Sequence, residues 1–425
     1  MNRGRTNFAI AGMAAALLVG TTACGGSTPS VDGKSDSNGS TAKGEKGTVT
    51  VGLLNPTSGP FAALGRDVNA GFQTYLDSKK GVLSGYGIEV VKEDEANDAG
   101  KATTKARQLV EQNKAQIVMG LVNSAVAYAV APYLEKAEVP LLITVAGADG
   151  LTRTKGGNVF RVSYTSSQDT MPAGEYTCKT LGHKTAAIVA LDYSFGWEGA
   201  GGFARTYEDA GCDVVQEIYA PLATQDWGPY VNQIKKSVDA VYVVSPGSDG
   251  IRFFKAYRGF GVKVPVIAHG STTDEQLLST QADTAKGAIT SLHYTPQLDT
   301  DVNKKFVKQF KDATDRGANQ YAEDGYTAAM TLEAALADIE GKASAATIED
   351  ALAGVSIEAP RGPMTFDEYG QAVYNVYMRK VEKKDGAWVN EPIEELPKTS
   401  QFWTYDPEEY LAFPTYEKLK GTWSK

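Results

Sequence analysis

The feature that most constrains the fold is an alternation of short apolar runs with longer segments of helical periodicity, which begins at Thr48. In the first unit, TVTVGLLNPTSGPFAAL, a β-branched run at 48–51 leads into a polar turn at 55–60 and a helical pattern from Phe61. Such units, repeated along a chain, require right-handed crossovers and a mainly parallel sheet, so the sequence predicts the α/β class. Further strand-like runs occupy residues 87–94, 115–120, 140–145, 184–192, 212–219, 239–244 and 264–268.

These units fall into two series, which predict two similar lobes. Residues 160–168 read as a short connection between the series, and helices at 301–352 and a strand at 372–381 follow them. In parallel sheets, ligands bind beyond the carboxyl ends of the strands, where turn amides and helix N-termini can hold an anion. The turns that should form a cleft are 55–64, 120–124 and 144–149 in the first lobe and 193–197, 245–249 and 269–272 in the second.

The N-terminus is typical of an export signal. Arg3 and Arg5 precede an apolar core at 8–20 that is too short to span a bilayer. The small residues directly before Cys24 resemble a bacterial lipoprotein signal, although Thr21 replaces the preferred leucine, and ordinary secretory cleavage nearby remains open. Residues 25–47 contain almost nothing apolar and predict a flexible tether.

Composition and cysteine usage exclude several classes of function. The 425-residue chain carries a formal net charge of −9 and no basic stripe, which argues against a nucleic-acid partner. Its three cysteines lack a CxxC spacing, so no structural zinc site is predicted. Because Cys178 and Cys212 both lie in the exported part, the sequence predicts a disulfide between them.

The motifs of common enzymes are missing from the sequence. GxxxxGK[ST], HExxH and GxSxG do not occur, and the GxGxxA match at 199–204 starts inside a predicted helix, where glycines more commonly serve close packing. The three histidines lie far apart; His269, at a cleft turn, is a candidate ligand donor. The sequence therefore predicts no catalytic residues, no metal site and no cofactor.

Seven stretches in order resemble one family over residues 48–425. They are VGLLNPTSGPFAALG, EDEANDAGKATTKARQLVEQNKAQIVMG, VPLLITVAGADGLT, ALDYSFGWEG, APLATQDWGPYVNQIK, PRGPMTFDEYGQAVYNVY and FWTYDPEEYLAFP. They are similar to the branched-chain amino-acid (leucine/isoleucine/valine-binding protein) type of ABC-transporter substrate-binding protein. The resemblance implies a type I periplasmic-binding-protein fold, with two Rossmann-like lobes joined by three hinge crossings near 162–167, 290–296 and 364–370.

The resulting division of the chain has five parts. We expect a lipoprotein signal peptide at 1–24, a tether at 25–47, lobe 1 at 48–163 and 295–365, lobe 2 at 164–294 and 366–400, and a surface-wrapping tail at 401–425.

The resemblance also implies where the ligand binds. Family members hold a ligand carboxylate with a serine hydroxyl and backbone groups, which here implies Ser124, Ala146 and Ala148; a helix N-cap role for Ser124 is compatible with this. Apolar walls would come from Phe61, Leu64 and Phe195, whereas Trp197 either joins them or packs elsewhere. The full predicted ligand set is Ser58, Phe61, Leu64, Asn123, Ser124, Ala146, Gly147, Ala148, Phe195, Trp197, Ser245, Asp249, His269 and Ser271.

One departure from the family leaves the ligand open. Amino-acid binders place an acidic residue on the second lobe to pair with the ligand ammonium, whereas Ser271 stands at that turn here. Asp249 or Asp274 could substitute, or could cap helices. Branched-chain amino acids and other small carboxylates, including aromatic acids, therefore both remain possible.

The predicted function is that of an extracytoplasmic solute receptor of an ABC importer. The lobes would close on a small carboxylate and deliver it to a permease with its ATPase. We expect a monomer, lipid-anchored through Cys24 to the outer face of the cell membrane. The alternatives are a ligand-sensing module for a membrane receptor and, as a third class, an enzyme.

Overall fold

The computed structural model describes residues 44–420, which contain two β-sheets. The first sheet is mostly parallel. Its central strand β1 (Thr48–Asn55) lies between β3 (Tyr86–Asp94) and β4 (Ile117–Gly120), and the registers pair Thr48 with Gly87 and Val51 with Ile117. In spatial order its strands are β2 (Val82–Leu83), β3 (Tyr86–Asp94), β1 (Thr48–Asn55), β4 (Ile117–Gly120), β5 (Leu141–Ile143) and β6 (Val159–Arg161).

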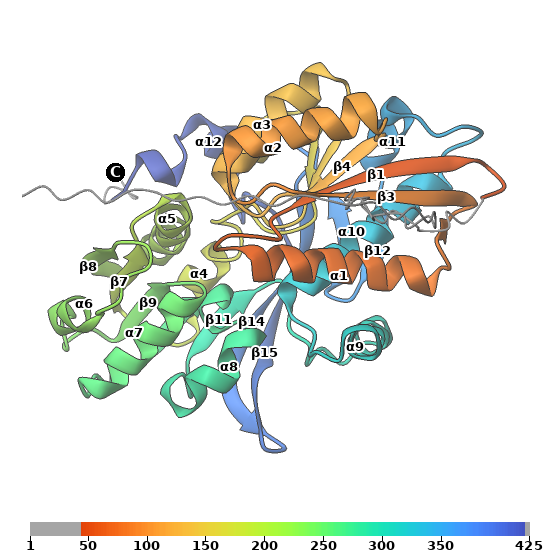
Figure 1. Ribbon diagram of the computed structural model, residues 1–425. Coiled ribbons are helices and arrows are strands. Elements are labelled where there is room, and N and C mark those ends of the chain that lie inside the picture. Colours follow the sequence, from red (N-terminus) through yellow and green to blue (C-terminus); the bar gives the residue numbers. More distant parts are fainter. Residues whose placement is uncertain (1–43, 421–425) are drawn as a thin grey trace, which may run out of the picture. The chain divides into compact units, whose positions relative to one another are not determined.

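Helices cover both faces of this sheet, because successive strand residues point to opposite sides. In β1, Val49 and Val51 join the core under α1 (Ala62–Ser78) and α10 (Gln320–Ala337), whereas Leu54 joins the core under α2 and α3 (Figure 1). A Cβ on Gly71 would lie 1.8 Å from the Ala322 carbonyl oxygen, so only glycine permits this close crossing of α1 and α10. The remaining helices of this lobe are α2 (Ala99–Arg107), α3 (Ser124–Lys136), α9 (Asp301–Thr314) and α11 (Ala345–Leu352).

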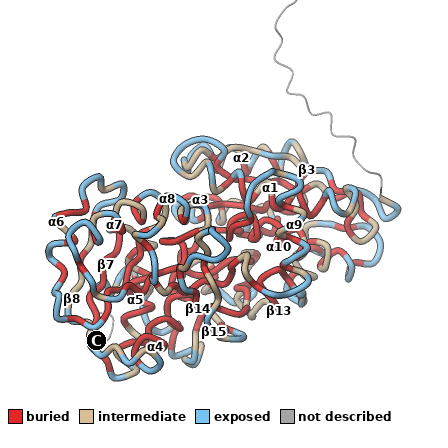
Figure 2. Tube along the Cα trace, turned by 90° about the horizontal axis from the view of Figure 1, so that it is seen from below, coloured by how far each residue is buried: buried red, intermediate tan, exposed pale blue. Residues whose placement is uncertain are grey.

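The second sheet has nine strands. Their order is β12 (Ser356–Ala359), β13 (Gly362–Phe366), β14 (Ala372–Lys384), β11 (Ile289–Leu292), β10 (Val266–His269), β9 (Ala240–Val244), β7 (Thr185–Leu191) and β8 (Asp213–Ala220), with β15 (Ala387–Thr399) antiparallel to β14. One face packs under α4 (Met171–Lys179) and α5 (Ser194–Asp209). The other packs under α6 (Gly228–Gln233), α7 (Ser248–Gly259) and α8 (Glu275–Gln281). Most residues of β7 and β14 are buried, as Figure 2 shows.

The chain passes from the first sheet to the second after β6. After β11 it leaves the second sheet for α9, α10 and α11, and it returns to the second sheet at β12. The helices α9 and α10 return to α1 of the first lobe, whereas β14 pairs with β11 of the second. The exact lobe boundaries stay a prediction, with which these contacts are compatible. Within residues 44–420, we find no helix with the length and apolarity needed to cross a membrane.

Several elements differ from the sequence-based expectation. The connection predicted at 160–168 begins with the last residues of β6, which add a sixth strand to the first sheet. The strand β15 was not predicted, because its sequence EPIEELPK carries the charges and prolines of an exposed sheet edge. The tether also ends earlier than predicted, because the Lys46 N–H donates to Gly85 and the Gly47 carbonyl accepts from Gly87. The predictions for residues 1–24, 25–43 and 421–425, including lipidation of Cys24, lie outside the described residues.

The C-terminal segment packs on the second lobe. Phe402, Tyr410 and Tyr416 are buried in the core of α4 and α5, and α12 (Pro407–Ala412) begins at the capping side chain of Asp406. The guanidinium of Arg205, in α5, lies 4.1 Å from the centroid of the Tyr405 ring. Beside this region, Cys178 in α4 and Cys212 before β8 form a disulfide with 6.0 Å between their Cα atoms.

Candidate functional site

The turns after β4 and β5 form a cradle of hydrogen-bond donors on the first lobe. The Ser124 Oγ accepts a 3.0 Å hydrogen bond from the Ala148 N–H. Its hydroxyl hydrogen has no acceptor among the described residues, and the same holds for the N–H of Gly147. A hydroxyl and a main-chain amide that are free to donate suit an anionic oxygen.

The helix N-cap alternative for Ser124 is wrong, because Asn123 takes that role. The Asn123 Oδ1 accepts from the Ala125 N–H, and its Nδ2 donates to Asn97 at 2.5 Å. Ser124 is the first residue of α3, so its hydroxyl is not needed as a cap. The Asn123 side chain therefore already has two hydrogen-bond partners, Asn97 and the Ala125 N–H.

Aromatic rings and a buried imidazole face each other on the second-lobe side. The ring of His269 lies 5.0 Å from that of Phe195 and 5.1 Å from that of Tyr164. The His269 Nδ1 accepts from the Ser271 N–H at 3.1 Å, which assigns the ring proton to Nε2. This Nε2 is buried and has no partner among the described residues. Burial lowers the pKa of His269 to about 4, so the imidazole is neutral near pH 7 and offers one N–H.

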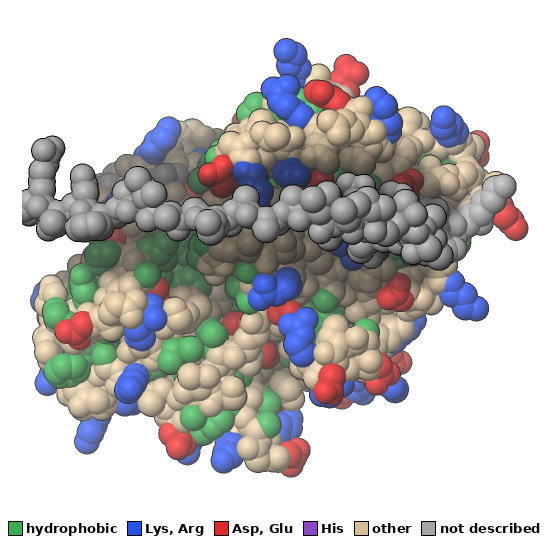
Figure 3. Space-filling view, in the orientation of Figure 1, with side chains coloured by type: hydrophobic (Ala, Val, Ile, Leu, Met, Phe, Trp, Pro, Cys, Tyr) green, Lys and Arg blue, Asp and Glu red, His purple; other side chains and the backbone are tan. Residues whose placement is uncertain are grey.

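Apolar side chains complete the surroundings on the first lobe. Phe61 and Leu64 pack against a small cluster formed by Val68, Val122, Val145 and Tyr321. In the space-filling view, Lys, Arg, Asp and Glu side chains are spread over the outer surfaces of the upper and lower parts of the molecule (Figure 3). The site therefore combines an anion cradle, an apolar wall and a neutral donor.

Some residues of the predicted ligand set have their polar groups engaged elsewhere. The Ser58 hydroxyl donates to Asp94 at 2.6 Å, and the Asp249 carboxylate binds Arg252 and the Ala223 N–H. The Trp197 indole donates to Asp192 at 2.8 Å. The Ser245 Oγ, by contrast, is buried without a partner among the described residues. Ligand contact by each of these residues stays a prediction, which the contacts favour only for Ser245.

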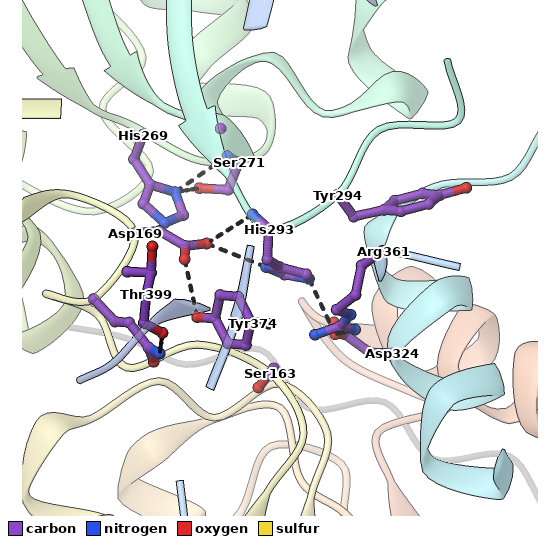
Figure 4. A network of polar contacts seen from close by, with 12 residues as sticks. Ser163, Asp169, His269, Ser271, His293, Tyr294, Asp324, Arg361, Tyr374 and Thr399 are labelled. Atoms are coloured by element: carbon purple, nitrogen blue, oxygen red, sulfur yellow. Dashed lines mark hydrogen bonds and ion pairs between the residues drawn. The ribbon is translucent and has the colours of Figure 1, made fainter. Parts of the chain in front are cut away.

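A buried polar network at the crossings was missed by sequence reasoning (Figure 4). The Asp169 carboxylate accepts from Tyr374 at 2.9 Å and contacts His293 Nδ1 at 3.1 Å, while His293 Nε2 lies 3.2 Å from Asp324. Arg361 donates to Asp324 at 2.7 Å and also contacts Glu323. Asp169 follows β6 and His293 follows β11, whereas Arg361 lies between β12 and β13. The network joins these segments to Tyr374 of β14 and to Asp324 of α10.

The same network contains a group that could in principle hold a metal. Ligand atoms of His293, Glu323 and Asp324 lie within 4.8 Å of one another. The Arg361 guanidinium, however, is fully buried against both carboxylates and already supplies the positive charge. The Arg361 guanidinium thus pairs with both carboxylates, and these residues form a buried ion-pair network.

The two buried histidines, His269 and His293, should make the stability of the protein depend on pH in opposite directions. Burial lowers the pKa of His269 below that of the unfolded chain, so stability is lost as the pH falls from about 6.5 to about 4. For His293, burial and Arg361 lower the pKa, but Asp324 and Asp169 outweigh them and raise it, so its contribution is lost as the pH rises. Urea unfolding between pH 4 and 8 should show a shallower acid-side loss for His269→Asn than for the wild type. Equal slopes for the two proteins below pH 6.5 would contradict this assignment.

Comparisons with known proteins agree on one family. The model of the family described as periplasmic binding protein matches residues 48–387. A Leu/Ile/Val-binding protein homolog of Brucella melitensis is 31% identical over 360 residues, which cover 82% of this chain and 92% of that protein.

Solved structures give the same result. An ABC transporter substrate-binding protein from Sphaerobacter thermophilus has a TM-score of 0.80 at 30% identity, covering 83% of this chain and 99% of that one. A solute binding protein of an ABC transporter from R. palustris, in complex with 4-hydroxybenzoate, has a TM-score of 0.78 at 28% identity, covering 84% and 98%. These relatives are binding proteins and not enzymes. The chain therefore belongs to the periplasmic binding protein family, as an extracytoplasmic substrate-binding protein of the Leu/Ile/Val-binding type that serves ABC transporters.

Proposed function

We propose that this protein binds a small aromatic carboxylate between its lobes and delivers it to an ABC permease. The observation that carries the proposal is the unpartnered Nε2 of His269, whose ring lies between those of Phe195 and Tyr164. Tyr164 in turn lies beside Gly147 of the cradle, since a Cβ on Gly147 would be 3.2 Å from its ring. The related R. palustris protein that binds 4-hydroxybenzoate supports the same ligand class.

Each end of such a ligand has a chemical partner in the site. The carboxylate would accept from the Ser124 hydroxyl and the Gly147 N–H, which are charge-assisted hydrogen bonds. The ring would pack between Phe195 and the cluster of Phe61 and Leu64. A hydroxyl on the ring would accept from His269 Nε2, so that neither polar group remains buried without a partner.

A second candidate is an α-amino acid, which Asp274 favours. The Asp274 Oδ1 accepts from Gln276, but its Oδ2 is buried without a partner among the described residues. Burial and the neighbouring Glu275 raise the pKa of Asp274, as expected for a carboxylate that lacks a cation. A ligand ammonium would supply that cation.

A thermal-shift series distinguishes the two candidates. Benzoate, 4-hydroxybenzoate, L-leucine and L-isoleucine are compared with acetate on the wild type, His269→Asn and Asp274→Asn. We expect 4-hydroxybenzoate to raise the midpoint most and His269→Asn to reduce that shift more than the shift with benzoate. A response to leucine alone that Asp274→Asn abolishes would establish the amino-acid candidate instead. No response to any of the four would refute both.

Replacing Ser124 by alanine should weaken binding of the aromatic acid roughly 10- to 100-fold, because a hydrogen bond to a charged group contributes about 1.5–3 kcal/mol. The measurement is titration calorimetry with 4-hydroxybenzoate. Ser78→Ala is the matched control. Ser78 is the last residue of α1 in the first lobe, and its hydroxyl donates only to the Tyr75 carbonyl. An affinity for Ser124→Ala within threefold of the control would remove Ser124 from the site.

The proposal extends to the setting in which the protein works. The sequence pattern before Cys24 supports a lipid anchor on the outer face of the membrane, and we infer a monomer that docks on permease and ATPase subunits. Metabolic labelling with a radioactive fatty acid, lost in Cys24→Ala, tests the anchor. Uptake of the labelled aromatic acid, lost when the gene is deleted, separates transport from a purely sensing role.

A further inference from the structure

The loop at 146–149 forms half of the anion cradle, and the carbonyl groups of residues 146, 147 and 148 are each held by hydrogen bonds. Arg161 Nη1 donates to the carbonyl oxygens of both Ala146 and Ala148, each at 2.9 Å. The carbonyl of Gly147 accepts from the N–H and the hydroxyl of Ser166, at 2.6 and 2.8 Å. Three consecutive carbonyls are therefore held by the segment that leads from the first lobe into the hinge.

The directions of these carbonyls determine the directions of the amides. In a planar trans peptide, the carbonyl of one residue and the N–H of the next point opposite ways. Because the Ala146 carbonyl points toward Arg161, the N–H of Gly147 points away from it and has no acceptor among the described residues. The Ala148 carbonyl likewise turns the N–H of Asp149 away from Arg161, toward the carboxylate of Glu198 at 3.2 and 3.3 Å.

Glu198 belongs to α5 of the second lobe, whereas Asp149 belongs to the first. Arg161 thus orients two amides through the same loop conformation. The N–H of Gly147 is left free for a ligand, and the N–H of Asp149 donates to the other lobe. Arg161 is itself rigidly held, because it is fully buried and donates from Nε to Gln371 at 2.6 Å and from Nη2 to Thr152 at 2.5 Å. A lysine cannot form this fork of hydrogen bonds.

We propose that Arg161 is a positioning residue for ligand binding: it orients the 146–149 loop so that Gly147 donates to the ligand carboxylate and Asp149 donates to Glu198 of the closing lobe. This role rests on the proposed binding of a carboxylate at the cradle, although the orientation of the loop itself is independent of the ligand. Arg161 does not touch the ligand, and its effect passes through the backbone alone.

The test compares Arg161→Lys with the wild type and with Arg153→Lys. Arg153 is the matched control, because it lies on the same segment but donates to the Tyr410 carbonyl and not to the loop. Amide hydrogen exchange of the 144–152 segment, without ligand, should be at least tenfold faster in Arg161→Lys and unchanged in Arg153→Lys, while β4 stays protected in all three. The dissociation constant for 4-hydroxybenzoate should rise tenfold or more only in Arg161→Lys.

Each outcome decides a separate question. Wild-type exchange in Arg161→Lys overturns the proposal, and so does faster exchange with unchanged affinity. If the wild type binds no carboxylate while exchange rises as expected, the proposed ligand class fails and the orientation of the loop by Arg161 is supported. If Arg161→Lys does not fold, Gln371→Leu takes its place, because it removes the acceptor of Arg161 Nε, together with the hydrogen bonds from Gln371 to Ser163 and Gln168. Unchanged exchange and affinity in that variant overturn the proposal.

Discussion

Replacing Arg361 by methionine is expected to lower the free energy of unfolding by about 3–5 kcal/mol, because it leaves two buried carboxylates without their cation. Arg361 is fully buried, donates to Asp324 at 2.7 Å and to the Val162 carbonyl at 2.7 Å, and also pairs with Glu323. Urea unfolding at pH 7 measures the loss. The loss should shrink at pH 5, since orphaned buried carboxylates take up protons there more readily than when they are paired.

The matched control for this variant is Lys308→Met. Lys308 pairs with Asp312 on the surface, where both side chains are more than half exposed, so the change should stay below about 1 kcal/mol. If Arg361→Met costs no more than the control, the hinge network does not depend on this charge. Adding Glu323→Gln to Arg361→Met should recover part of the stability, because one orphaned charge is removed.

The second large effect concerns the disulfide between Cys178 and Cys212. The bond closes a loop with a sequence separation of 34 residues, and the chain-entropy model gives a stabilisation of about 3–4 kcal/mol for a loop of this length. Cys178→Ala with Cys212→Ala should therefore reduce the free energy of unfolding by that order. Reduction of the wild type should reproduce most of the loss.

Peptide mapping provides the direct measurement of the bond. The fragments that contain Cys178 and Cys212 should appear as one linked species without reductant and as two species with it. Free thiols at both positions in the protein isolated from an oxidising compartment would contradict the assignment. An unchanged unfolding midpoint in the double variant would show that the link adds no stability.

The elements that the sequence predicted well are those with a strong local period. The helices α9 (Asp301–Thr314), α10 and α11 lie in the region 301–352 that was predicted to be helical. The parallel strands β1, β3, β4, β5, β7, β8, β9 and β10 were found from their apolar runs, whereas the short parallel strands β6 and β11 were not predicted as strands. The strand β15 and the helix α12 lack such runs, because few of their residues are buried.

In the candidate site, too, some residues were predicted from the sequence and others were not. The turns that contain Ser124, Phe195 and His269 were predicted because they lie at strand ends, the edge where ligands bind in parallel sheets. The roles of Ser124 and Phe195 were implied by the family resemblance. Arg161, Asp169 and Arg361 were not predicted to have any role. The partners of a buried charge lie far away in sequence: Arg161 meets Gln371, 210 residues along the chain, and Asp169 meets His293, 124 residues along.

By itself, the sequence determined the α/β class, the two series of units and the turns at the strand ends, because these depend on local periodicity and on residue types at strand ends. The family followed from the stretches that resemble it. Only the tertiary structure decided which groups in those turns remain free to donate. It placed the cap of α3 on Asn123, left Nε2 of His269 unpartnered and turned the amide of Gly147 outward. The physical reason is that the availability of a hydrogen-bond donor depends on every partner that folding brings to it, and those partners come from distant parts of the chain.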